Sequence, residues 1–165
     1  MPFADAAAHG DIVFNATSGL AALGALNAAG ADTLRGKTVI DISNPLDFSA
    51  GFPPTLSVCN DDSLGEQIQR AFPDANIVKT LNTVNALVMV DPASVGGGEH
   101  DMFVAGNDAA AKAEATQILT DWFGWRTVID LGDITNARGM EMYLPLWVRL
   151  YGNLGTGAFN IRIVR

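Results

Sequence analysis

The protein has 165 residues, of which 48% are hydrophobic, and this is enough for one hydrophobic core and favours a single domain. Its 18 acidic and 10 basic residues give a formal net charge of -8, which argues against nucleic acid or an anionic membrane surface as a partner. Phosphorylated small molecules are not excluded, because backbone N–H groups at helix N-termini can bind them inside an acidic protein.

Cysteine and histidine give no sign of a disulfide or a metal centre. Cys59 is the single cysteine, and its neighbours lack the spacing of metal ligands. His9 and His100 lie far apart in the sequence, so we expect both on surface loops and predict no metal site. The chain has neither the pattern of a secretion signal nor an apolar run of about 18 residues. These features predict a cytoplasmic protein.

Short apolar, β-rich runs alternate along the chain with segments that have helical patterns. Continuous apolar runs of this length are typical of strands that are buried on both faces of a sheet. We expect strands at residues 11–15, 38–42, 76–80, 101–105 and 127–131. The alternation predicts parallel strands joined by right-handed crossovers, with helices on both faces of the sheet. The expected fold is therefore α/β and Rossmann-like.

Helical segments are recognisable before and between these strands. A short helix is expected at residues 4–9, and an alanine- and leucine-rich helix at 18–29. Ser63 and Glu66 have the spacing of a capping box, which predicts a helix that begins there. Asp108 is suited to cap a third amphipathic helix.

The C-terminal part of the chain has a different pattern. Residues 137–154 are expected to form one longer helix, which Pro145 should bend near its middle. Leu146 and Leu150 lie off its main apolar stripe, so a second face of the helix could pack against its own sheet, a partner subunit or a bound ring. Residues 159–165 alternate enough to be expected as a last strand.

The glycine pattern of dinucleotide-binding domains, G-x-G-x-x-G after a first strand, does not occur in the sequence. The nearest match begins with residues 155–157, but it follows a helix and has Asn160 in place of the third glycine, so we expect a turn. Residues 1–165 are therefore interpreted as a single, partial, N-terminally truncated domain. Strand 11–15 would then have a free edge that favours pairing with a second copy, which predicts a homodimer.

Three segments that end expected strands carry a resemblance to a known family. They are DIVFNAT at 11–17, KTVIDISNP at 37–45 and VKTLNT at 78–83, followed by GND at 106–108 and DLGD at 130–133. In this order they resemble the deazaflavin (coenzyme F-420)-dependent NADP oxidoreductases, also called NADPH-dependent deazaflavin reductases. The resemblance extends over nearly the whole chain. It implies an oxidoreductase that transfers a hydride between NADP(H) and coenzyme F-420. Because the glycine pattern that would hold the cofactor phosphates is absent, we expect residues 1–165 alone to be weakly active or inactive.

The residues alone also indicate a ligand site, because open α/β sheets bind ligands at the carboxyl ends of their strands. Thr17 and Ser18 could bind a ribose or phosphate, and Asn44 a nicotinamide carboxamide or ribose. Pro45 could hold a turn rigidly against a ring, and the two residues after the third strand suit the polar edge of either ring. The candidate cofactor-binding residues are Thr17, Ser18, Ser43, Asn44, Pro45, Asn82 and Thr83.

Ordinary structural roles are also available for these residues. Thr17 and Ser18 could cap a helix. Asn44 and Pro45 are common turn formers, and Asn82 could brace a loop. The joint occurrence of such residues at three successive strand ends favours the functional interpretation.

No catalytic acid or base is expected, because two redox cofactors would supply the chemistry and the protein their alignment. Three aspartates are accordingly expected to be structural: Asp41, Asp130 and Asp133. Two other functions stay open. One is an NAD(P)-dependent reductase of a small imine, carbonyl or metal substrate, and the other is a non-catalytic domain that dimerises.

Overall fold

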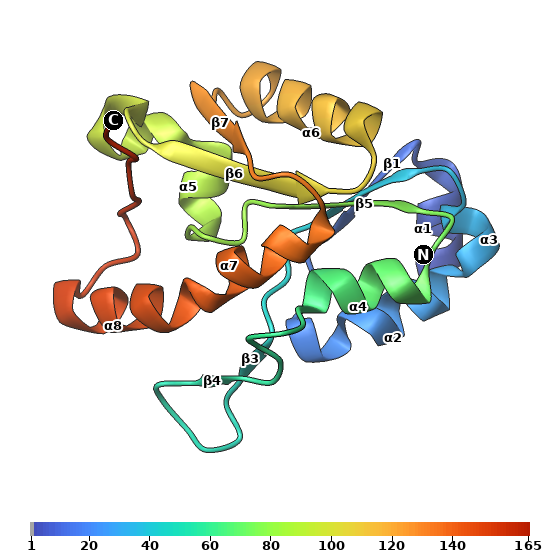
Figure 1. The fold of residues 1–165 in the computed structure, drawn as a ribbon, viewed down its shortest axis with the longest axis horizontal. Coiled ribbons are helices and arrows are strands. Elements are labelled where there is room, and N and C mark those ends of the chain that lie inside the picture. Colours follow the sequence, from blue (N-terminus) through green and yellow to red (C-terminus); the bar gives the residue numbers. More distant parts are fainter. Residues whose placement is uncertain (1) are drawn as a thin grey trace.

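The structure, a computed structural model, describes residues 2–165, so Met1 lies outside the described residues. In the described part, five strands form one sheet in the order β1-β2-β5-β6-β7 (Figure 1). These strands are β1 (Ile12–Asn15), β2 (Thr38–Asp41), β5 (Asn76–Thr80), β6 (Asp101–Gly106) and β7 (Thr127–Asp130). All the expected strands of this sheet are present, and each boundary lies within about a residue of its expected position.

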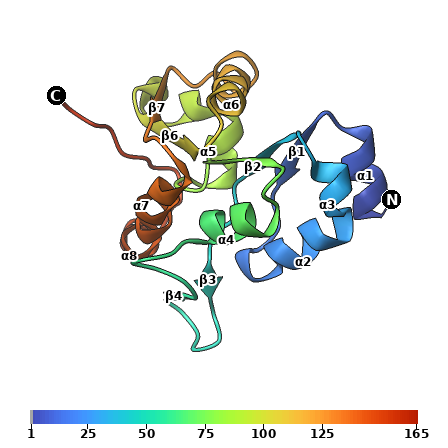
Figure 2. The same ribbon diagram turned by 45° about the vertical axis from the view of Figure 1, so that its right-hand side comes forward.

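The strands are connected by helices, short 3-10 turns and one hairpin. The helices are α1 (Phe3–His9), α2 (Gly19–Ala29), α3 (Ala31–Leu34), α4 (Leu64–Ala71), α5 (Ala86–Val90), α6 (Ala109–Asp121), α7 (Ala137–Met142) and α8 (Leu144–Leu154). The 3-10 turns are η1 (Pro92–Ser94), η2 (Gly96–Gly98) and η3 (Ile134–Asn136). The hairpin, β3 (Leu46–Asp47) and β4 (Thr55–Leu56), was not expected, and it extends away from the sheet in Figures 1 and 2.

Helices cover both faces of the sheet, as the sequence predicted. Successive residues of a strand point to opposite faces. Val39 and Ile77 therefore join a core with α1, α2 and α4, whereas Ile40 and Val78 join a second core with α6. Figure 1 shows α6 on one side of the sheet and α2, α4 and α7 on the other. In the described residues, no helix is both long and apolar enough to cross a membrane.

The direction of β6 corrects one expectation. We expected parallel strands throughout, but β6 pairs antiparallel with β5, with Lys79 opposite Ala105. The chain between them contains only α5 and two 3-10 turns, so it folds back beside β5 instead of crossing the sheet. Because β7 is parallel to β6, the carboxyl ends of β1, β2 and β5 lie at one edge, and those of β6 and β7 lie at the other.

Both predicted helix caps are confirmed. The Ser63 hydroxyl accepts the Glu66 N–H at 3.1 Å, so Ser63 caps α4, and it also donates to the Glu66 carboxylate at 2.7 Å. The Asp108 carboxylate accepts the Ala111 N–H at 2.7 Å at the start of α6. These bonds satisfy N–H groups that have no partner inside their own helix.

The long C-terminal helix is interrupted. The expected helix at 137–154 is divided at Tyr143 into α7 and α8. Pro145 lies in the first turn of α8, and because it has no N–H it cannot donate to the carbonyl of Glu141. The interruption therefore falls just before the proline that was expected to bend the helix.

The expectation of a last strand at 159–165 is wrong. The segment contacts the start of β6 through the Asp101 N–H, which donates to the Ile161 carbonyl at 3.1 Å. The Asn160 side chain donates to the Asp101 carbonyl at 2.9 Å, and the Asp101 carboxylate accepts the Ile163 N–H at 2.6 Å. Only the first of these three bonds joins two backbone groups, and the other two involve side chains. The segment therefore does not form a further strand of the sheet.

The expectation for the histidines is half right. His9 is exposed at the end of α1. His100 is 5% exposed, contacts the Trp125 ring edge-on, and forms a 2.9 Å hydrogen bond with the Pro92 carbonyl. His100 directly precedes the buried strand β6 and is therefore buried with it. The Pro92 carbonyl and the Asn160 side chain form hydrogen bonds with its two ring nitrogens.

An ion pair between α4 and α7 generates a prediction on acid stability. Arg138 donates to the two carboxylate oxygens of Glu66 at 2.8 and 2.6 Å, and these bonds hold the pKa of Glu66 below its ordinary value. A lowered folded-state pKa contributes stability above the unfolded pKa of about 4.3, and this contribution is lost as the pH falls through the folded-state pKa.

Glu66→Gln should therefore lower the free energy of unfolding at pH 7 by about 1–2 kcal/mol and reduce its decline between about pH 5 and pH 3. Urea unfolding at about pH 7, 5 and 3 measures the free energy of unfolding and its decline. Glu114→Gln, the same chemical change at an exposed position of α6, is the matched control and should change neither value. An equal decline in wild type and Glu66→Gln would contradict the assignment.

Candidate functional site

A pocket opens at the carboxyl edge of the parallel strands. It lies between the start of α2, the loop after β2 and the β3–β4 hairpin. Its lining residues are Thr17, Ser18, Gly19, Leu20, Ile42, Ser43, Asn44, Leu46, Asp47, Phe48 and Ser49. Four of the predicted site residues, from two strand ends, thus line one pocket: Thr17, Ser18, Ser43 and Asn44.

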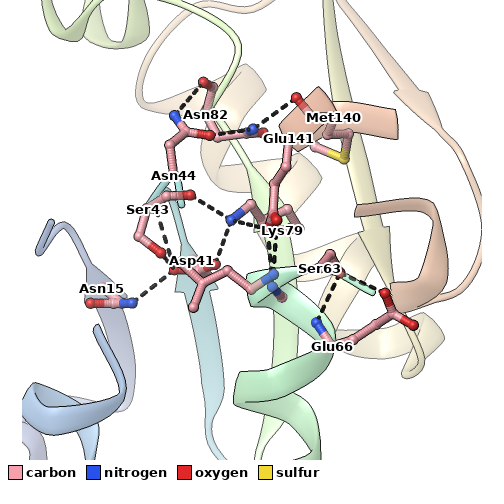
Figure 3. Close-up of polar contacts among 12 residues, drawn as sticks. Asn15, Asp41, Ser43, Asn44, Ser63, Glu66, Lys79, Asn82, Met140 and Glu141 are labelled. Carbon is pink, nitrogen blue, oxygen red and sulfur yellow. Dashed lines mark hydrogen bonds and ion pairs between the residues drawn. The ribbon is translucent and has the colours of Figure 1, made fainter. Parts of the chain in front are cut away.

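Asn82 and Thr83 follow β5 but do not line this pocket. They are 1% and 2% exposed. The Asn44 side chain donates to the Asn82 carbonyl at 2.8 Å, and the Asn82 side chain donates to Asn44 Oδ1 at 2.9 Å (Figure 3). A further bond from Asn82 to the Met140 carbonyl, at 3.1 Å, connects the pair to α7. Asn82 therefore braces Asn44, which is the structural role that the sequence left open for it.

Pro45 and Ser18 are placed differently from each other. The Pro45 carbonyl accepts the Ser57 N–H at 2.8 Å, so the turn at Pro45 is connected to the hairpin. Ser18 occupies the N-cap position of α2, but its hydroxyl makes no capping hydrogen bond. The Thr17 hydroxyl donates to Asn15 Oδ1 at 2.7 Å. Of the two hydroxyls at the start of α2, that of Thr17 is engaged by Asn15, whereas that of Ser18 is left for other partners.

Gly19 allows the two pocket segments to approach closely. A Cβ atom at this position would lie 1.9 Å from the Asn44 carbonyl oxygen and 3.0 Å from Pro45 Cα. Both contacts are with backbone atoms, which cannot rotate away as a side chain can. Only glycine fits at this first position of α2, because any side chain would collide with the backbone of the loop after β2.

The Asp41 carboxylate joins the ends of β1, β2 and β5. It is fully buried, and it accepts from the Asn15 amide at 2.8 Å and from the Ser43 hydroxyl at 2.6 Å. Its other oxygen accepts from Lys79 Nζ at 2.8 Å. Asp41 thus has the structural role that we expected, and it fixes the start of the Ser43–Asn44 segment.

Lys79 and Glu141 complete this network, and sequence reasoning missed both. Lys79 Nζ lies 2.9 Å from Glu141 Oε1 and donates to the Ser43 carbonyl at 2.5 Å. The Glu141 carboxylate also accepts the N–H groups of Leu64 and Gly65 at 2.8 and 3.0 Å, at the N-terminus of α4. Burial alone would lower the pKa of Lys79, but the charges of Asp41 and Glu141 raise it above its ordinary value.

The other two aspartates lie at the opposite edge of the sheet. Asp130 forms an ion pair with Lys112 at 2.8 Å, and Asp133 caps the turn η3 through the Thr135 N–H at 3.0 Å. Neither borders the pocket. Within residues 2–165, no group of three or more His, Cys, Asp and Glu side chains has an arrangement that could hold a metal ion.

Substituting the two glycines of α2 tests the close approach. Gly19→Ala should lower the free energy of unfolding by about 2–3 kcal/mol, because its methyl group collides with backbone atoms. Gly24→Ala, in the same helix with nothing within 4 Å of its added Cβ, should raise it by about 0.5–1 kcal/mol. Thermal unfolding of both variants measures the difference. Equal stabilities would show that the two segments do not touch as described.

An α/β sheet with a pocket at the carboxyl ends of its parallel strands defines a Rossmann-like domain. The crystal structure of an Arthrobacter sp. FB24 protein, assigned as an F-420-dependent NADP reductase, superimposes with a TM-score of 0.97. The two sequences are 61% identical, and the match covers 99% of this chain and 74% of that one. This chain therefore belongs to the F-420-dependent NADP reductase family, which confirms the resemblance found in the sequence.

Two more distant proteins are also similar to this chain. The rat metalloreductase STEAP3 is 26% identical over 121 residues; the match covers 71% of this chain, which spans 22% of the length of that protein. Pyrroline carboxylate reductase from Plasmodium falciparum, with NADP bound, has a TM-score of 0.54 at 16% identity, over 93% of this chain and 50% of that one. The latter similarity concerns the fold alone. No family model matches the chain.

Proposed function

We propose that the protein binds NADP(H) and the deazaflavin coenzyme F-420 at the carboxyl edge of β1, β2 and β5 and allows hydride transfer between them. The observation that carries this proposal is the single pocket formed by the predicted segments after β1 and β2, with the segment after β5 directly behind it. Membership of the F-420-dependent NADP reductase family supports it.

The residues present fit two ring-bearing cofactors. Leu20 and Phe48 line the pocket although they are 67% and 56% exposed, so a planar ring would cover apolar surface that is now open to water. Hydroxyl and amide groups line the same pocket. Behind it, Asn82 Oδ1 and the Thr83 hydroxyl are buried and have no hydrogen-bond partner within residues 2–165. Because neither residue lines the pocket, these orphaned polar atoms suit an ordered water that connects them to a ligand.

The protein's own contribution would be binding and alignment. When bound, the nicotinamide and deazaflavin rings supply the hydride donor and acceptor, so no acid or base of the chain is required. Asn44 has one amide donor and one acceptor site engaged by Asn82, which fixes the orientation of its side chain and leaves one of each for a ligand. In this proposal Ser18 and Thr17 meet the ribose or phosphate, and Pro45 keeps the turn rigid.

Calorimetric titration of the purified chain with NADPH, alone and with coenzyme F-420, tests this proposal. We expect a dissociation constant on the order of micromolar, and tighter binding of NADPH when the second cofactor is present. Absence of heat with either cofactor would contradict the proposal for this chain. The similarity to a metalloreductase makes reduction of a ferric chelate by NADPH the alternative to assay in parallel.

A substitution at Asn44 tests the assignment of the pocket. Asn44→Ala should weaken NADPH binding about tenfold, because a ligand then loses one oriented hydrogen-bonding group. Asn27→Ala, at an exposed position of α2, is the matched control and should bind as wild type does. Unchanged binding by a folded Asn44→Ala protein would exclude Asn44 from the site.

We further infer a homodimer that forms through the free edge of β1. In the described chain β1 pairs on one side only, with β2, and an apolar groove runs along it beside α1 and α2. A lysine on an edge strand opposes pairing. Phe14→Lys should therefore convert a dimer to a monomer in light scattering, whereas Phe52→Lys, on the exposed hairpin, should not. A monomeric wild-type protein at all concentrations would refute the dimer.

A further inference from the structure

Three charged side chains lie buried behind the pocket without lining it. Lys79, Asp41 and Glu141 are at most 1% exposed, and they come from β5, β2 and α7. Burying such groups is costly unless each is paired and hydrogen-bonded, and a sheet can be stabilised as well by apolar residues. Their position next to the candidate site therefore calls for an explanation other than stability.

The Lys79 ammonium has three N–H donors, and each has its own acceptor. Two are the carboxylates of Asp41 and Glu141, at 2.8 and 2.9 Å, and the third is the Ser43 carbonyl at 2.5 Å (Figure 3). These acceptors belong to different elements. One side chain thus fixes the distance between β2, the loop that follows β2, and α7.

Lys79 is connected to both members of the Asn44–Asn82 pair. On one side, the Ser43 carbonyl is held by Lys79 and the Ser43 hydroxyl by Asp41, so the residue before Asn44 is fixed at both ends. On the other side, Glu141 follows Met140, whose carbonyl accepts from the Asn82 side chain.

We propose that Lys79 is a positioning residue, which sets the placement of Asn44 against Asn82 and through them the alignment of ligands in the pocket. This inference rests on the proposed function. Lys79 does not line the pocket, so it acts through Ser43 and α7 and not by touching a ligand. Its raised pKa keeps it a three-way donor at neutral pH.

The main test uses a variant without any of the three charges. Lys79→Met alone would leave two buried carboxylates unpaired, so it is combined with Asp41→Asn and Glu141→Gln, which keep similar volumes. Leu119→Ala, a fully buried change in α6 outside this network, is the control for a general loss of stability. Glu141→Gln alone, which retains the Lys79–Asp41 pair, replaces the triple variant if the latter does not fold.

Amide hydrogen exchange of the ligand-free proteins is the first readout. In the triple variant, exchange at residues 43–44 and 82–83 should become at least about tenfold faster than in wild type, while the Leu119→Ala control changes α6 instead. Glu141→Gln should accelerate exchange at 82–83 and leave 43–44 unchanged. Equal exchange at these positions in all proteins would overturn the inference, whether or not the wild type binds NADPH.

Steady-state kinetics is the second readout, for a wild type that has passed the binding test. Misplacement of a bound ligand by about 1 Å can cost on the order of 100-fold in rate. We therefore expect kcat to fall by about that factor in the triple variant, with a much smaller change in KM for NADPH. A kcat equal to that of Leu119→Ala, per folded molecule, would show that the cluster is merely structural. If the wild type has no activity, the proposed function is refuted. Amide hydrogen exchange then tests by itself whether Lys79 positions Asn44 and Asn82.

Discussion

The ammonium of Lys79, buried between two carboxylates, is the contact on which the carboxyl edge of the sheet depends. The cluster carries one more negative than positive charge, so further donors must compensate for it. Asn15 and Ser43 supply them to Asp41, and the N-terminus of α4 supplies two N–H groups and its positive dipole end to Glu141. The groups that compensate these charges come from β1, the loop after β2, β5 and α4, and their hydrogen bonds hold these elements in one arrangement.

The reversal of β6 determines which elements can form the pocket. Because the ends of β6 and β7 lie at the other edge, the site edge receives carboxyl ends only from β1, β2 and β5 in the described sheet. Helix α7 returns from that opposite edge and brings Met140 and Glu141 to the site (Figure 1). At Gly19, the start of α2 approaches the loop after β2 so closely that a side chain would collide with its backbone. Strand ends, one returning helix and one glycine thus define the site together.

Local patterns predicted much of this structure. Strand positions and the caps at Ser63 and Asp108 follow from apolar runs and hydrogen-bonding side chains only a few residues apart. The direction of β6 depends on a loop whose path no local pattern specifies. Sequence reasoning passed over Lys79, although a lysine within an apolar strand signals a buried charge that needs a partner. Its partner Glu141 lies 62 residues away in sequence, so only the packing of α7 identifies it. The braced pair of Asn44 and Asn82 likewise needed the fold, because the sequence gives their positions but not their contact.

The central claim is that the ligand site lies at the carboxyl edge of β1, β2 and β5. Two-dimensional amide NMR spectra of the labelled protein, recorded during addition of NADPH, test it most directly. The account predicts that the largest shift changes fall at residues 17–20, 43–44 and 82–83, while 106–108 and 130–133 at the opposite edge stay unchanged. Changes concentrated at the opposite edge, or saturating NADPH without any change at the first three segments, would contradict it.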